Sequence, residues 1–89
     1  MKELRELREE ITAVDLEMAA LFEKRMAVSQ EIAVYKKEHG LPVYDAAREQ
    51  ENLKAAETRV PEELVPLYRR FLQMNMDLSK EYQQKKQEE

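Results

Sequence analysis

Apolar residues recur every three or four positions along the first third of the chain, the spacing of one face of a long helix. They are Leu4, Leu7, Ile11, Val14, Met18, Leu21, Val28, Ile32 and Tyr35. The alternating steps form a heptad seam, and neither Pro nor Gly interrupts it before Gly40. The pattern predicts one helix over residues 3–38, roughly 50 Å long.

Two shorter helices are predicted after it. Gly40 suits the left-handed position that ends a helix, and Pro42 prevents the first helix from resuming. Asp45 is a good N-cap for a second helix over about 46–58. Pro61 ends that helix and is placed to begin a third, over about 62–85.

The expected third helix has its own apolar face, which we predict to be its core face. That face comprises Leu64, Leu67, Tyr68, Phe71, Met74, Leu78 and Tyr82. The chain is therefore predicted to be a single all-α domain, 1–89, of three helices with one very long N-terminal member. That helix is longer than a compact domain of this size, whose radius of gyration is about 13 Å. Its bare apolar stripe predicts a partner helix, most simply from a homodimer.

Composition narrows the classes of function. The 89 residues are 43% apolar and 38% charged and include no Cys, so no disulfide or thiolate metal site can form. His39, the single histidine, cannot build a zinc site alone. No apolar run approaches the roughly 20 residues of a membrane span, and no signal peptide is evident, which predicts a soluble, cytoplasmic protein. A net charge of −4 argues against nucleic-acid binding.

One position in the heptad seam is charged. Between Leu21 and Val28 the seam position falls on Arg25, and a cation there is costly unless it is paired. Arg25 would by itself be read as a polar residue that fixes helix alignment. Lys36, however, lies three turns further along the same face.

Arg8 lies at the edge of that seam but some 42 Å from Lys36 along a straight helix, too far for one site within one chain. In an antiparallel dimer, Arg8 of one chain would approach Arg25 and Lys36 of the other. Such a group of cations suits a small di-acid or a phosphate, because Arg binds carboxylates in bidentate geometry.

Polar residues of the second and third helices would complete this cavity. Arg48 can point into it from the second helix, and Glu49 and Asp45 can accept from a ligand hydroxyl. Ser79 and Gln83 lie one turn apart and can supply neutral hydrogen bonds. Taken singly, these residues are better explained as solvent-facing polar side chains; their joint pattern is what indicates a site.

The chain resembles the small all-helical (type II) chorismate mutases over nearly its full length. The segments that carry the resemblance are "LREEITAVD" (7–15), "EKRMAVSQEIAVYK" (23–36), "DAARE" (45–49) and "SKEYQ" (79–83). The resemblance implies an intertwined homodimer with two shared active sites. It also implies that the protein rearranges chorismate to prephenate for phenylalanine and tyrosine synthesis, without a cofactor.

The resemblance also implies the role of each site residue. Arg25, and Arg8 from the other chain, would clamp the substrate carboxylates, with Arg48 and Ser79 on the same side. Lys36 would bridge a carboxylate and the ether oxygen, to which Gln83 also donates. Glu49 would accept from the ring hydroxyl, with Asp45 nearby.

The sequence departs from the family pattern at Ala46, where relatives often have Pro, and at Asn75, where they tend to be apolar. Shifting the alignment of the third helix by one residue would place Leu78 and Tyr82 in the site instead of Ser79 and Gln83. Leu78 and Tyr82 are better suited to the core, so we keep the alignment that places Ser79 and Gln83 in the site. Two alternatives are an isochorismate pyruvate lyase, which Glu49 disfavours, and a non-catalytic regulatory helical dimer. An aromatic-pathway enzyme is a further partner to consider.

Overall fold

The computed structural model describes residues 1–88, and every regular element among them is helical. Helix α1 runs from Leu4 to Glu38, α2 from Ala46 to Arg59 and α3 from Val65 to Gln87. A 3₁₀ turn, η1, spans Glu62–Leu64 between α2 and α3. The predicted all-α fold with one very long N-terminal helix is confirmed.

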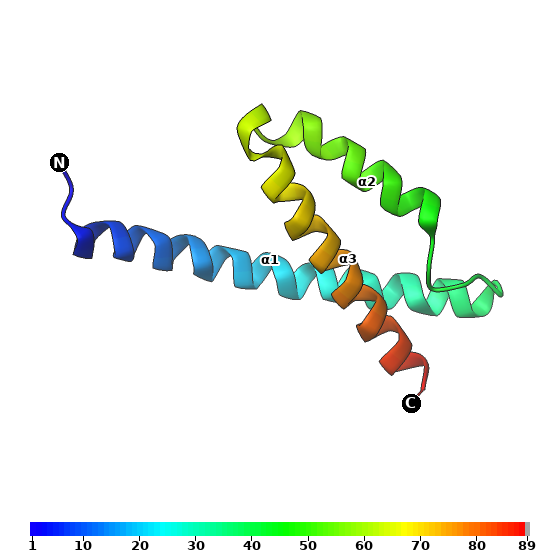
Figure 1. Ribbon diagram of the computed structural model, residues 1–89. Helices are drawn as coiled ribbons and strands as arrows, with labels where there is room; N and C mark the ends of the chain where they lie inside the picture. The colour runs from blue at the N-terminus through cyan, green and yellow to red at the C-terminus, as the bar shows by residue number, and fades with distance from the viewer. Residues whose placement is uncertain (89) are drawn as a thin grey trace.

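Helix α3 packs against both other helices, while the N-terminal half of α1 projects beyond them (Figure 1). The molecule measures 56 × 29 × 14 Å and has a radius of gyration of 16.3 Å. A compact globule of this length would have a radius of gyration of about 12 Å. The chain is therefore an elongated body with a free helical arm.

A glycine in the left-handed region reverses the chain after α1. Gly40 has φ of 64°, and its N–H donates to the carbonyl of Lys37 at 3.4 Å. The N–H of Leu41 donates to the carbonyl of Lys36 at 2.8 Å. These two bonds form a Schellman motif, which pairs carbonyls that the helix end leaves open.

The start of α2 is as predicted, and the start of α3 differs. The Asp45 carboxylate caps α2 by accepting from the backbone N–H of Arg48 at 3.0 Å. After Pro61 the chain makes the 3₁₀ turn first, so the α-helix begins three residues later than residue 62. Pro66 lies in the first turn of α3, where its missing N–H costs no hydrogen bond.

The apolar face predicted as the core of the third helix is wrong for four of its seven residues within one chain, whereas Tyr68, Leu78 and Tyr82 are partly buried. Leu64, Leu67, Phe71 and Met74 are all exposed. The buried apolar side chains of the described residues are Ala33, Ala56, Val65, Leu72 and Met76. Helix α3 thus turns a neighbouring stripe toward α1 and α2 and leaves much of its widest apolar face uncovered.

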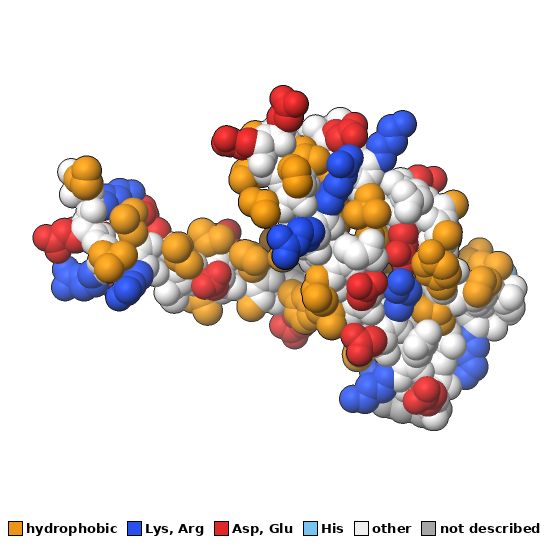
Figure 2. Space-filling view, viewed as in Figure 1, with side chains coloured by type: hydrophobic (Ala, Val, Ile, Leu, Met, Phe, Trp, Pro, Cys, Tyr) orange, Lys and Arg blue, Asp and Glu red, His pale blue; other side chains and the backbone are white. Residues whose placement is uncertain are grey.

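The heptad seam of α1 is also uncovered in the single chain. Leu4, Ile11 and Leu21 expose 61%, 62% and 64% of their surface, and apolar side chains line the projecting arm in Figure 2. A contiguous exposed stripe of this kind marks an interaction surface. No helix within residues 1–88 has the length and apolar character needed to cross a membrane.

We predict that Gly40→Ala lowers the free energy of unfolding by about 1–2 kcal/mol, because a Cβ disfavours the left-handed conformation. No atom lies within 4 Å of the added Cβ, so backbone strain alone causes the loss. Gly40→Asn should cost less, because Asn tolerates this conformation. Urea unfolding followed by circular dichroism measures both, and equal losses for Ala and Asn would contradict the explanation.

Candidate active site

A cavity of about 420 Å³ lies where the three helices and the loop before α2 meet. Its volume is within the range of small-molecule sites. The side chains and backbone that line it are those of Arg25, Val28, Ser29, Ile32, Lys36, Val43, Asp45, Arg48, Glu49, Asn52, Met76, Ser79, Lys80 and Gln83. Every element of the chain except the η1 turn contributes to this lining.

Positive charge predominates around the cavity. Its lining carries four cationic side chains and two carboxylates. Cations that converge on a partly dehydrated pocket bind anions more strongly than they do in water. No group of three or more potential metal ligands was found among residues 1–88. The cavity therefore has the charge expected for a small anionic ligand.

Arg25 is held at the boundary of α1 and α3. Its Nη1 donates to the Ser79 hydroxyl and, at 3.4 Å, to the backbone carbonyl of Asn75. The Asn75 side chain donates to the carbonyl of Phe71 in its own helix and does not line the cavity. The cation in the heptad seam is thus paired by polar groups of α3, which orient its guanidinium at the cavity wall.

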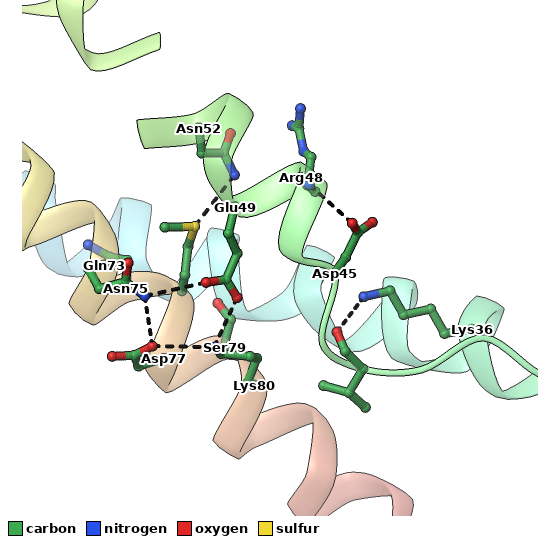
Figure 3. A network of polar contacts seen from close by, with 12 residues as sticks. Lys36, Asp45, Arg48, Glu49, Asn52, Gln73, Asn75, Asp77, Ser79 and Lys80 are labelled. Carbon is green, nitrogen blue, oxygen red and sulfur yellow. Dashed lines mark hydrogen bonds and ion pairs between the residues drawn. The ribbon is translucent and has the colours of Figure 1, made fainter. Parts of the chain in front are cut away.

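Lys36 reaches the cavity from the C-terminal end of α1. Its Nζ donates to the backbone carbonyl of Val43 at 2.7 Å, across the turn that follows the helix (Figure 3). An ammonium group has three hydrogens, so this bond directs the side chain and leaves donors for a ligand. The turn at Gly40 is what brings the Val43 carbonyl back to Lys36.

Gln83 is a buried amide at the cavity wall. It is 6% exposed, and its Nε2 donates to the Ser29 hydroxyl of α1 at 2.8 Å. Its Oε1 is buried without a hydrogen-bond partner. Such an unpaired buried group costs stability, and an unsatisfied group of this kind in a native fold requires an explanation.

The three predicted site residues at the start of α2, Asp45, Arg48 and Glu49, point their side chains in different directions. The Asp45 carboxylate is occupied as the N-cap. The Arg48 guanidinium pairs with Glu51 at 3.2 Å and points away from the Glu49 carboxylate in Figure 3. Glu49 is turned toward α3, where Lys80 Nζ lies 2.9 Å from its Oε2. The hydrogen bond to Glu49 is the main cause that raises the pKa of Lys80, and partial burial opposes it.

The structure brings most of the predicted site residues together. Arg25, Lys36, Asp45, Arg48, Glu49, Ser79 and Gln83 all line the cavity. Leu78 and Tyr82 line a different surface cleft, in agreement with the register chosen for α3. Arg8 is exposed on the projecting arm, 17 positions before Arg25, which is about 26 Å along a helix. One chain by itself therefore does not bring Arg8 to the site.

Sequence reasoning missed three polar residues of the cavity: Ser29, Asn52 and Lys80. Helical spacing could have found the first two, because Ser29 lies one turn after Arg25, and Asn52 one turn after Glu49. Asn52 Nδ2 lies 3.7 Å from the Met76 sulfur, a contact between α2 and α3. Lys80 follows Ser79 directly, and only the packing of α2 on α3 shows that it meets an acid.

We predict that Ser29→Ala and Gln83→Leu each lower the free energy of unfolding by about 1–2 kcal/mol, because each leaves a buried polar partner unpaired. The double variant should lie close to the wild type, because it removes both partners and the unsatisfied Oε1 together. Urea unfolding at one protein concentration measures the cycle. Additive losses in the double variant would contradict the predicted coupling.

Comparison with known proteins identifies the family of the chain. The model of the family "Chorismate mutase type II" matches residues 7–84, which include all eight predicted site residues. The chain is also 40% identical over 55 residues to the T-protein of Haemophilus influenzae. That match covers 62% of this chain and 15% of the T-protein, so the chain spans only a small part of that relative. No solved structure was found to match the chain.

The family match extends from the projecting arm of α1 to the last turns of α3, so it includes all three helices. The chain belongs to the type II chorismate mutase family, which is a family of isomerases.

Proposed function

We propose that this protein rearranges chorismate to prephenate in aromatic amino acid biosynthesis. The observation that carries the proposal is the cationic cavity, in which Arg25, Lys36, Glu49 and Gln83 converge from all three helices. The substrate is a dicarboxylate with a ring hydroxyl, and the cavity offers cations for the acids and a carboxylate for the hydroxyl. Family membership supports the same assignment.

The reaction breaks one C–O bond and forms one C–C bond within a single molecule, so its atoms and electrons balance without a co-reactant. It requires no nucleophile or general base. Two effects can accelerate it: holding the enolpyruvyl side chain over the ring, and placing donors at the ether oxygen where negative charge develops. A rigid pocket with fixed donors supplies both.

Two donors are assigned to the ether oxygen. Lys36 Nζ is already directed by the Val43 carbonyl, and the Gln83 amide is directed by Ser29. Each donor group carries more than one hydrogen, so each can keep its protein partner and still bind the substrate. Because their positions are set before the substrate binds, little reorganisation accompanies the transition state.

The remaining residues orient the substrate. Arg25, fixed by Ser79, is assigned to a carboxylate, and Glu49 to the ring hydroxyl. Arg48 would join the carboxylate side after leaving Glu51, with which it forms an exposed ion pair that is easily exchanged. Asp45 keeps its capping role and lies at the edge of the pocket.

A second copy of this chain would complete the site with Arg8. The support for an intertwined homodimer is the exposed seam of α1 and a second cleft, of about 740 Å³, beside Arg25. Apolar side chains that line this cleft are Met18, Ala19, Leu21, Phe22, Tyr68, Phe71, Leu72, Met74 and Leu78. Burying both surfaces against a partner arm would bring the partner subunit's Arg8 toward Arg25. The proposal also includes a cytoplasmic location and another aromatic-pathway enzyme as a partner.

The test of the function is the loss of chorismate absorbance on addition of the purified protein, with the product identified by chromatography. We expect prephenate, and we expect Arg25→Ala to lower kcat/KM by about 100-fold or more, as loss of a charged contact in a dehydrated site does. Circular dichroism of the variant controls for folding. Pyruvate release from isochorismate, with no prephenate formed, would instead identify a lyase, and inactivity with both substrates would favour a regulatory dimer.

The shared site is tested by mixing inactive Arg8→Ala and Arg25→Ala chains. In a two-fold dimer each mixed pair regains one intact site, so an equal mixture should recover about one quarter of wild-type activity after full exchange. Subunit exchange is verified with a mass-tagged chain. No recovery after verified exchange would contradict the assignment of Arg8 to the neighbouring site.

A further inference from the structure

Lys80 lines the cavity but has no part in the mechanism above. It projects from α3 and pairs with Glu49 of α2 at 2.9 Å. The side chains of Lys80 and Glu49 are 26% and 14% exposed, whereas those of the Arg69–Glu57 pair, which joins the same two helices, are 42% and 57% exposed. Among residues 1–88, Lys80 is the cation that pairs with Glu49.

Lys80 belongs to a closed ring of four polar side chains (Figure 3). Glu49 Oε2 binds Lys80, and Glu49 Oε1 accepts from Gln73 Nε2 at 3.4 Å. Gln73 also donates to Asp77 Oδ1 at 3.0 Å, and Lys80 Nζ lies 3.4 Å from that same oxygen. Two residues of α3, Lys80 and Gln73, thus hold both oxygens of one carboxylate of α2, and Asp77 links these two residues to each other.

This arrangement restricts the Glu49 side chain without using all its lone pairs. A glutamate has three rotatable side-chain bonds, and fixing them after a ligand arrives would cost affinity and rate. Each carboxylate oxygen can accept more than one hydrogen bond, so one oxygen can bind the ring and a substrate hydroxyl together. Glu49 is therefore held in advance by α3 and still able to accept.

The charges around Lys80 argue against its being a further clamp for substrate carboxylates. Its ammonium is shared by two acids, Glu49 and Asp77, and lies 4.8 Å from the centre of the Tyr44 ring. A cation already compensated by two carboxylates attracts an anion weakly. Lys36 and Arg48 form their contacts with other groups, the Val43 carbonyl and Glu51.

We propose that Lys80 is a positioning residue that sets the Glu49 carboxylate for the ring hydroxyl of the substrate. The inference rests on the proposed mutase activity and adds to it a residue that acts through Glu49 without touching the substrate. It also assigns a role to the Gln73–Asp77 pair, which fixes Lys80 from its own helix.

The test is steady-state kinetics of Lys80→Met and Lys80→Arg with chorismate. Lys80→Met keeps the length of the side chain and removes its charge, so Glu49 loses its strongest partner. We expect kcat/KM to fall about tenfold, with kcat decreasing as well as KM rising, because a misoriented ring disfavours the reactive conformer. Lys80→Arg restores the charge and should remain within about threefold of the wild type.

A double-mutant cycle separates action through Glu49 from any other role. In a Glu49→Gln background the carboxylate that Lys80 holds is gone, so Lys80→Met should change kcat/KM by less than about twofold. An equal tenfold loss in both backgrounds would overturn the inference, because Lys80 would then act on the substrate or on the fold directly.

Arg69→Met is the matched control. It also removes a cation that pairs across α2 and α3, at 2.8 Å from Glu57, and Arg69 does not line the cavity. We expect Arg69→Met to keep wild-type kcat and KM; if it reproduces the Lys80→Met defect, or if Lys80→Met is within about twofold of the wild type, the inference is overturned. A wild type without mutase activity would overturn the proposed function, whereas an active wild type insensitive to Lys80 would overturn this inference alone.

Discussion

The length of α1 is the constraint on which the rest of the structure depends. Its 35 residues extend about 52 Å, and α3 packs only against its C-terminal part, while the N-terminal half projects beyond both shorter helices. The chain therefore has a small core and a long exposed apolar seam. The arm that lacks a cover in one chain also carries Arg8, which does not line the cavity of that chain, and this is why we propose a site shared between two chains.

Three of the eight buried side chains among residues 1–88 are polar. Ser29, Ser79 and Gln83 are as buried as the few apolar core residues, and they are paired across α1 and α3. Buried polar groups contribute little net stability and cost much when unpaired. Their placement at one cavity, with Gln83 Oε1 left without a partner, is the pattern expected where stability is exchanged for a binding site.

The cations and the acid that line the cavity have different kinds of partner. The cations of α1 face it with backbone or hydroxyl partners, so their charge remains available to an anion. The acid of α2 is instead neutralised by a lysine of α3, so Glu49 can accept a hydrogen bond without strongly opposing an anionic ligand. Arg25 and Lys36 have neutral partners, so each can still bind a carboxylate of a ligand. Glu49 has a charged partner, Lys80, which fixes its position and compensates its charge.

The sequence by itself determined the three helices, most of their ends and most of the polar residues that line the cavity. Heptad spacing predicts α1, Gly40 and Asp45 mark the turn into α2, and Arg25 in an apolar seam marks the cavity, because these signals depend on residues close together in one helix or turn. Only the tertiary structure decided which stripe of α3 is buried and that Lys80 meets Glu49. Those outcomes depend on how α3 is rotated against two other helices, and its apolar residues are distributed too broadly around the helix for spacing alone to specify that rotation.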